Sequence, residues 1–169
     1  ISSVGGLAPT GLAADGEVED YAVQIVNTQF SINDPSVTEG NAGTSNLLFT
    51  VTRSNNASAC SVNYAITGGT ATVADLDYQA LAAGTLTFTA GGALTATITV
   101  VVNGDVKVEL NETVDITLSA PVNASILDGS GTGTIVNDDA AVITINNQTV
   151  TEGDVSTTTS ITFTITMSN

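Results

Sequence analysis

The chain contains no histidine, no tryptophan and only one cysteine, Cys60. These absences exclude a Ser-His or Cys-His catalytic pair, a zinc site built from histidine and cysteine, and an intrachain disulfide. We therefore expect no enzyme and no catalytic residue, and the acidic side chains remain as candidates for chemistry. Cys60 opens a predicted strand, where a buried thiol and an intermolecular disulfide are both compatible with the sequence.

Basic residues are almost as rare, because only Arg53 and Lys107 stand against 17 acidic residues, for a formal net charge of −15. So negative a surface repels nucleic acid and anionic membranes and attracts divalent cations. No segment approaches the roughly 20 apolar residues that a membrane-spanning helix needs. We expect neither nucleic-acid binding nor membrane insertion. The scarcity of lysine and the abundance of Thr, Ser, Asn and Gly favour a secreted, extracellular bacterial protein at the cell surface.

What the sequence does contain is a series of short segments in which Val, Ile, Leu and Thr alternate with period two. This alternation is typical of half-buried strands. The pattern predicts an all-β, immunoglobulin-like antiparallel β-sandwich of seven strands, with no helix. The expected strands cover residues 30–38, 46–53, 60–66, 85–89, 94–102, 112–119 and 132–136. The expected inward residues of two of them are Leu94, Ala96, Ile98, Val100 and Val102, and Val114, Ile116 and Leu118.

An internal repeat divides the chain into modules. The residues FSIN at 30–33 and VTEG at 37–40 return as ITIN at 143–146 and VTEG at 150–153. Glu152 lies 113 positions after Glu39, and a period of that length is a whole sandwich, not one rung of a solenoid. We expect three parts: residues 1–27 as the end of a preceding module, 28–139 as one complete domain, and 140–169 as the opening strands of a second, tandem domain.

The second unit would supply only two strands, with Ile161, Phe163, Ile165 and Met167 on an apolar face, while residues 17–27 would form an unpaired strand. One interpretation is that the tail of one copy completes a domain with the head of the next, a head-to-tail contact that propagates into a filament. The alternative is that the chain is a slice of an array, in which adjacent repeats provide the missing strands.

Most acidic residues of the complete unit fall in connections that an up-and-down sandwich brings to one pole. They are Glu39, Asp75, Asp77, Asp105, Glu109, Glu112, Asp138 and Asp139. Crowded carboxylates raise one another's pKa values unless a cation neutralises them. Calcium accepts roughly six to eight oxygen ligands from flexible loops, so the cluster predicts a Ca²⁺ site. The alternative is that acids collect in loops because strands exclude them, and we expect Asp75 and Asp115 to be solvated residues outside the site.

Several motifs together resemble the Calx-beta family of calcium-binding domains, over residues 30–139 and again over 142–169. They are VTEG at 37–40, DY at 77–78 with GTLTF at 84–88, ELNE at 109–112 with VDITLS at 114–119, and GTIVNDD at 133–139. The resemblance implies metal ligands at Glu39, Asp77, Asp105, Glu109, Glu112, Asp138 and Asp139. Between residues 103 and 111 the chain is less acidic than exchanger-type members. The segment GLAADGEVEDY at 11–21 resembles the GEVED-type ending of bacterial extracellular repeat proteins.

The residues NDDAAV at 137–142 lead from the acidic pole into the next repeat without a Gly, Ser or Pro linker. We therefore expect a calcium-binding structural module of a bacterial extracellular fibre, stalk or adhesin, in which Ca²⁺ stiffens the joints between domains or subunits. The expected partners are copies of the chain itself or adjacent repeats. The alternative function is an adhesion domain that contacts host or matrix surfaces, for which three tyrosines and no tryptophan provide few aromatic contacts.

Overall fold

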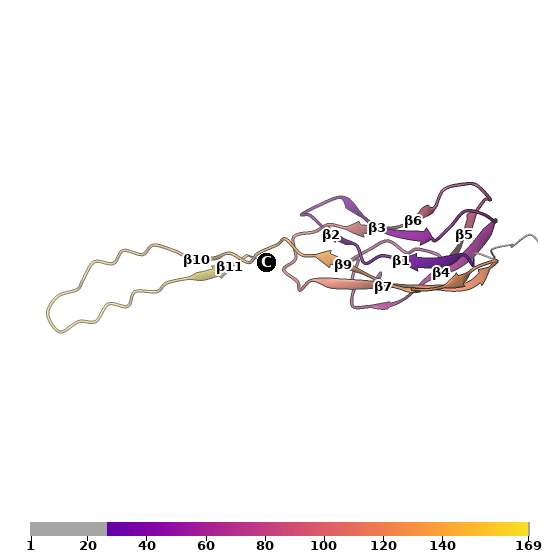
Figure 1. Cartoon of the computed structure of the whole chain (residues 1–169). Helices are drawn as coiled ribbons and strands as arrows, with labels where there is room; N and C mark the ends of the chain where they lie inside the picture. The colour runs from indigo at the N-terminus through magenta and orange to yellow at the C-terminus, as the bar shows by residue number, and fades with distance from the viewer. Residues whose placement is uncertain (1–26, 169) are drawn as a thin grey trace, which may run out of the picture.

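The computed structural model describes residues 27–168 of the chain. The expected preceding module and its GEVED-like segment therefore lie outside the described residues, apart from Asn27. Within the described range the chain forms 11 strands and no helix, and none of it offers a helix that could cross a membrane. The strands group into a compact body and a hairpin that projects from one end of it (Figure 1).

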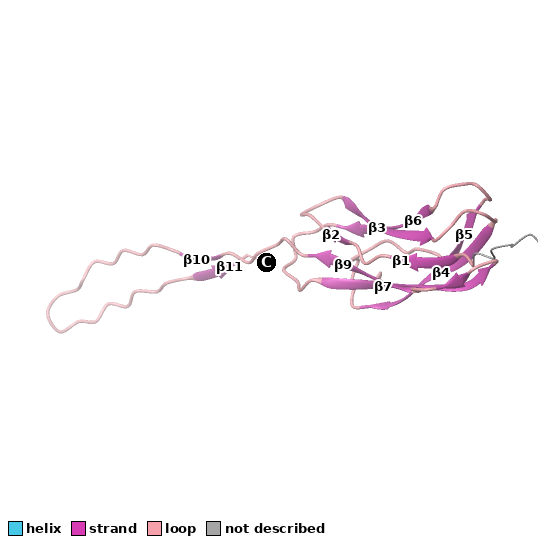
Figure 2. Cartoon of the chain, in the orientation of Figure 1, coloured by secondary structure: helices cyan, strands magenta, loops and turns pink. Residues whose placement is uncertain are grey.

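The body contains nine strands in two sheets that face each other (Figure 2). Their bounds are β1 (Gln29–Ile32), β2 (Ser36–Thr38), β3 (Thr44–Arg53), β4 (Cys60–Gly69), β5 (Gly84–Phe88), β6 (Thr95–Asn103), β7 (Glu112–Val122), β8 (Ser125–Ile126) and β9 (Ser130–Val136). One sheet has the order β6-β3-β1-β8 and the other β2-β9-β7-β4-β5. The predicted all-β sandwich is confirmed.

The predicted strand over residues 30–38 is two strands that belong to different sheets. β1 pairs antiparallel with β3, whereas β2 pairs parallel with β9. The crossing occurs at Asn33, Asp34 and Pro35, where proline has no N–H to donate to a ladder. The Asn33 Oδ1 accepts a hydrogen bond from the Thr50 N–H at 2.6 Å, and the Asp34 Oδ1 accepts one from the Thr132 N–H at 2.7 Å. This division and the two-residue β8 give the body nine strands where seven were expected.

The core lies between the two sheets and is mainly aliphatic, with four buried aromatic residues, Phe30, Phe49, Tyr78 and Phe88. Phe30 and Phe49 are completely buried, and the burial of such a side chain contributes about 1.5–3 kcal/mol. Of the predicted inward residues, Ile98, Val100, Val102, Val114, Ile116 and Leu118 are buried and Ala96 packs against the core. The prediction for Leu94 is wrong, because this residue precedes β6 and its side chain is 46% exposed.

The single cysteine, Cys60, and one of the two basic residues, Arg53, meet at the pole where β3 ends and β4 begins. Cys60 is a buried free thiol, the first of its two alternatives. Arg53 is 1% exposed, and its guanidinium donates hydrogen bonds to the carbonyl oxygens of Ser58, Thr89 and Ala93 at 3.1, 2.8 and 3.0 Å. It also lies 5.2 Å from the centroid of the Phe88 ring. One arginine thus ties two connections of this pole to the end of β3.

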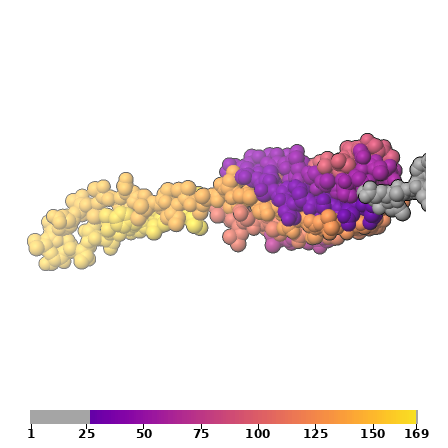
Figure 3. Space-filling model, in the orientation of Figure 1, coloured from indigo at the N-terminus to yellow at the C-terminus, as the bar shows by residue number. Residues whose placement is uncertain are grey.

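The hairpin consists of β10 (Ile143–Ile145) and β11 (Ile165–Met167), which pair antiparallel. The space-filling view shows it standing away from the body (Figure 3). It leaves the body after β9, at the pole opposite to Arg53. Its side chains are exposed throughout the described part of the segment 140–169.

Candidate metal centre

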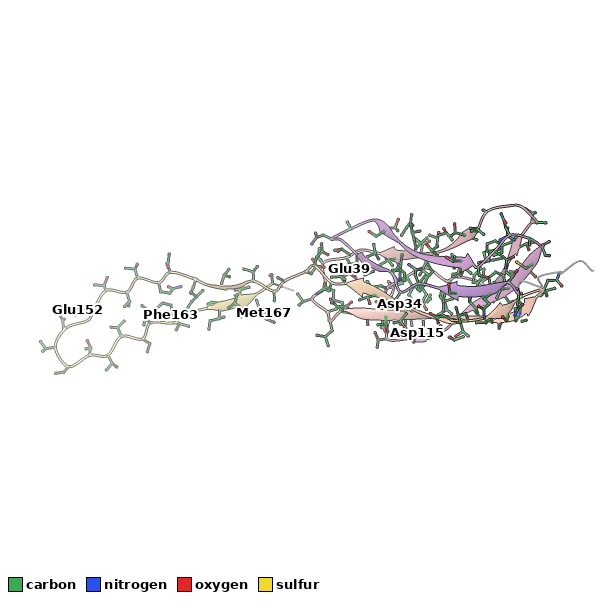
Figure 4. The ribbon with its side chains drawn as sticks, viewed as in Figure 1. Asp34, Glu39, Asp115, Glu152, Phe163 and Met167 are labelled. Carbon is green, nitrogen blue, oxygen red and sulfur yellow. The ribbon has the colours of Figure 1, made fainter. Side chains whose placement is uncertain are left out.

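The connections at the hairpin end of the body carry the predicted acidic residues. Glu39 lies at this end, whereas Asp34 and Asp115 lie farther along the body (Figure 4). The ends of β2, β6 and β9 and the start of β7 converge here, because β3 pairs with β6, and β9 pairs with both β2 and β7. The topology therefore gathers acids that are distant in sequence.

The first group of carboxylates is Glu39, Asp138 and Asp139, which we call the first triad. One carboxylate oxygen from each lies within 4.8 Å of the others. The parallel pairing of β2 with β9 positions them, since Thr38 is opposite Val136 and the Glu39 N–H donates to the Val136 carbonyl oxygen at 3.2 Å. The residues that follow these two strands are consequently adjacent.

Hydrogen bonds hold the first triad, but they leave one buried oxygen without a partner. The Gly40 N–H donates to the Asp138 Oδ1 at 3.1 Å, and the Asn41 side-chain amide donates to the Asp139 Oδ1 at 2.5 Å. The Asp139 Oδ2 is buried and has no hydrogen-bond partner among the described residues. A buried carboxylate oxygen without a donor is costly unless a cation satisfies it.

The second triad is Asp77, Glu109 and Glu112, whose ligand atoms also lie within 4.8 Å of one another. Asp77 is 8% exposed, and its Oδ2 accepts a hydrogen bond from the Thr72 N–H at 2.6 Å. The Asn103 N–H donates to the Asp77 carbonyl oxygen at 2.9 Å, which fixes this loop to the end of β6. Glu112 opens β7, so the triad joins the connection between β4 and β5 to the connection between β6 and β7.

Asn137 links the two triads, a role that sequence analysis did not assign to it. Its side-chain amide donates to the Glu109 carbonyl oxygen at 2.8 Å, and its Oδ1 accepts from the Asp139 N–H at 3.1 Å. Its own N–H donates to the Asn111 Oδ1 at 3.2 Å. The signal was its place in the NDD motif directly after the last predicted strand, where an amide can serve both neighbouring loops.

Sequence analysis also did not predict the role of Gly104, whose lack of a side chain allows a close backbone contact with Gly40 and Glu39. A Cβ at this position would collide with the Gly40 carbonyl oxygen and lie 2.8 Å from that of Glu39. The connection from β6 to β7 therefore packs directly on the backbone of the first triad. Sequence analysis included Gly104 only in the range 103–111, which is less acidic than in exchanger-type members.

Burial and mutual repulsion raise two of the carboxyl pKa values strongly. The Glu39 pKa rises to about 7, first because the group is buried and then because Asp105 and Glu109 repel its charge. The Glu112 pKa also rises to about 7, through burial and then through a hydrogen bond with Asp77. Both shifts penalise the ionised forms, and a bound cation would remove that penalty.

The remaining acids of this pole lie outside the two triads. Asp105, the seventh ligand in the prediction, is exposed, and its Oδ1 accepts from the Lys107 N–H at 2.7 Å. The Asp75 Oδ2 accepts from the Thr72 hydroxyl at 2.9 Å. The Lys107 ammonium forms an ion pair with the Glu109 carboxylate. Six of the seven predicted ligands thus form the first and second triads, and Asp105 belongs to neither.

The two triads offer only carboxylate oxygens, the donors that hard cations such as Ca²⁺ prefer. Together with the unpartnered Asp139 oxygen, this donor set fits a divalent cation. The acidic pole is separate from a shallow, open depression of about 280 Å³ on the surface formed by β4, β5 and β7. The depression is lined by Asn63, Tyr64, Ala65, Ala83, Gly84, Thr85 and Ser119, so no carboxylate borders it.

Comparison with known families gives one match, to the Calx-beta domain, over residues 22–149. No curated protein matches the chain. Among solved structures, the apo-form Calx CBD1 domain has a TM-score of 0.57 and 22% identity, and the match covers 68% of this chain and 100% of that one.

Two further similar structures are both described as CBD12. CBD12 from CALX1.2 has a TM-score of 0.55 and 22% identity, covering 69% of this chain and 48% of that one. The calcium-binding domain CBD12 of CALX1.1 has a TM-score of 0.52 and 27% identity, covering 68% and 45%. The chain thus spans about half the length of each CBD12 structure.

Proposed function

Because the chain belongs to the Calx-beta family, we propose that its body is a calcium-binding module whose site is the acidic pole. The observation that carries this proposal is that two carboxylate triads lie at this pole and that the first triad contains the buried, unpartnered Asp139 Oδ2. One solved structure similar to this chain is described as a calcium-binding domain. The absence of histidine and the position of the site among loops favour binding over catalysis.

Glu39, Asp138 and Asp139 would hold one ion, and Asp77, Glu109 and Glu112 a second. Asp105 stays a candidate ligand of the first ion, because it is the carboxylate with the largest effect on Glu39. When bound, Ca²⁺ supplies positive charge that neutralises the ionised triads. Calcium sites in extracellular modules have dissociation constants of about 10⁻⁴ to 10⁻³ M, and we expect a value in this range.

The biological role that we propose is mechanical. Asp138 and Asp139 are the residues by which the chain leaves the body toward the hairpin. A cation held by them and by Glu39 would fix the exit direction of the chain and stiffen the joint. The acidic, lysine-poor composition supports a place in a bacterial extracellular fibre, stalk or adhesin. We favour this role over a surface-binding adhesion domain because the depression on the β4–β5–β7 surface is shallow and has one aromatic residue, Tyr64.

Calorimetric titration and thermal melts of the full chain test the calcium site. Ca²⁺ at about 100 times Kd should stabilise the body by about 2.7 kcal/mol for each bound ion, and EDTA should reverse the shift in melting temperature. Asp139→Asn and Glu112→Gln keep side-chain size while removing one charge from each triad, so each should weaken Ca²⁺ binding at least tenfold.

The matched control is Asp128→Asn, an equally small change at the opposite pole, which should leave Ca²⁺ binding unchanged. Titrations without heat, together with a melting temperature that EDTA does not alter, would show that the acidic pole holds no calcium.

A further inference from the structure

The hairpin exposes a row of large apolar side chains. The exposed fractions are 69% for Ile143, 52% for Phe163, 68% for Ile165 and 66% for Met167. Phe163 and Met167 lie along the hairpin well outside the body, as Figure 4 shows. Ile143 and Ile145 lie opposite Met167 and Ile165, so these side chains share one face of the hairpin, and an exposed apolar face favours binding of another polypeptide segment.

The hairpin repeats the pairing of β1 with β3. In the body, Ser31 is opposite Thr52 and Ile32 is opposite Val51. In the hairpin, Thr144 is opposite Thr166 and Ile145 is opposite Ile165. Each of these β10 residues lies 113 positions after its counterpart in β1, and each of these β11 residues lies 114 positions after its counterpart in β3. The two strand pairs therefore have the same register.

The side-chain hydrogen bond beside this pairing is repeated as well. The Asn33 Oδ1 accepts from the Thr50 N–H at 2.6 Å, and the Asn146 Oδ1 accepts from the Thr164 N–H at 2.7 Å. Asn146 and Thr164 are again 113 and 114 positions after their counterparts. The hairpin thus has the pairing geometry of β1 with β3 in the body, and not that of an arbitrary pair of strands.

Counterpart residues differ completely in burial. Phe49 is 0% exposed in the body, but Phe163, its counterpart, is 52% exposed, and the same contrast separates Val51 from Ile165. In the body, β6 pairs along β3 from Thr52 to Thr44, and the β2-β9-β7-β4-β5 sheet covers the apolar face. The described part of the hairpin has no equivalent of either cover.

We propose that the hairpin is a strand-complementation surface for a polypeptide segment that supplies the equivalents of β4 to β9 of a Calx-beta-type sandwich and has no equivalents of β1 and β3. A β6-like strand would add to the free edge of β11, and the second sheet of that segment would cover Ile143, Phe163 and Ile165. This inference is independent of the calcium site and extends beyond it.

The body of an intact second copy does not fit this surface. Its own β1 and β3 already occupy the matching positions, with Phe30, Phe49 and Val51 completely buried. Each copy also carries a net charge of −15, and residues 140–169 add two acids and no basic residue, so charge opposes association of copies. The surface therefore selects a sandwich that lacks its first strand pair.

The test extends the full chain in frame. Ser168 and Asn169 correspond to Ser54 and Asn55 by the 114-residue shift, so a second copy of residues 56–139 placed after Asn169 continues the repeat without a gap. If the hairpin complements these strands, amide exchange at 143–145 and 165–167 should slow at least about 100-fold. A second cooperative unfolding transition should accompany this protection.

Two variants of the extended chain sharpen the result. Phe163→Asp should abolish the new transition while the transition and Ca²⁺ response of the body stay unchanged, which separates this proposal from the calcium site. Met167→Arg replaces the counterpart of Arg53 and restores the guanidinium that ties the loops of the body, so it should raise the stability of the new domain.

The absence of protection in both the extended chain and its Met167→Arg variant would overturn the proposal. So would concentration-dependent self-association of the unextended chain that protects the hairpin amides and is lost in Phe163→Asp, because a second copy would then be the cover. Sedimentation velocity and hydrogen exchange at two protein concentrations measure this outcome.

Discussion

At the scale of single residues, Lys107 is the one side chain of the acidic pole that competes with a bound cation. Its ammonium pairs with the Glu109 carboxylate, and this contact raises the lysine pKa, so the amine stays charged. The Lys107 side chain is 55% exposed, and exposed pairs of this kind are weak. Removing the ammonium should therefore change calcium binding in a measurable but modest way.

We predict that Lys107→Gln strengthens Ca²⁺ binding about two- to fivefold, because Ca²⁺ no longer has to displace the Lys107 ammonium from the Glu109 carboxylate. Lys107→Arg keeps the positive charge and should bind Ca²⁺ like the natural chain. Titration calorimetry at low ionic strength compares the three proteins. Weaker binding by Lys107→Gln would mean that the lysine organises the second triad instead of competing for it.

Residue type and topology predicted that the acids gather at one pole, and six of the seven proposed ligands do fall into two compact triads. That these residues bind a cation stays a prediction. Asp105 is harder to place from sequence, because its carboxylate turns back to accept from the Lys107 N–H within its own loop. Asp75, which was expected outside the site, also bonds locally, with Thr72. Such local side-chain bonds depend on loop conformation, which alternation of apolar residues does not encode.

At the scale of elements, strand existence followed from the period-two pattern, but sheet membership did not. The first predicted strand changes sheets at Pro35, and the residues around Pro35 do not indicate that β1 pairs with β3 and β2 with β9. The parallel pairing of β2 with β9 is the contact that brings Glu39 beside Asp138. The central contact of the site is therefore a long-range one that local sequence could not specify.

The β6–β7 connection yields a prediction through Gly104. Gly104→Ala places a Cβ against the carbonyl oxygens of Gly40 and Glu39, and backbone atoms cannot move aside as a flexible side chain can. The connection should shift away from the first triad and weaken Ca²⁺ binding about tenfold, equivalent to about 1.4 kcal/mol. Calorimetry and urea unfolding measure binding and stability separately.

Gly91→Ala is the matched control, because Gly91 has a φ of 69° and open space around its Cβ position. It lies between β5 and β6 at the opposite pole, so backbone strain of about 1 kcal/mol should lower stability without altering calcium affinity. Equal calcium affinities in Gly104→Ala and the natural chain would show that the close approach of Gly104 does not shape the site.

At the scale of the whole molecule, charge is distributed so that calcium and folding are coupled. The acidic pole concentrates carboxylates, whereas Arg53 is buried at the other end of the body. The Glu39 and Glu112 pKa values rise from 4.5 to about 7 in the folded, calcium-free chain. Folding therefore binds protons at these two groups, and its stability must depend on pH.

The sign of this dependence follows from the direction of the shifts. A carboxyl group with a raised folded-state pKa contributes its full stabilisation below the unfolded value of 4.5 and loses it as the pH rises through about 7. We predict that in EDTA the melting temperature of the body falls across this interval. In saturating Ca²⁺ it should stay nearly level, because the ion stabilises the ionised carboxylates and binds more tightly as they deprotonate.

The double variant Glu39→Gln/Glu112→Gln provides the control, since neutral amides of the same size cannot titrate. Its melting temperature in EDTA should be higher than that of the natural chain above pH 7 and should vary much less with pH, while its response to Ca²⁺ should largely disappear. A melting temperature of the natural chain that rises with pH in EDTA would contradict the coupling, because the folded state would then release protons at the acidic pole instead of binding them.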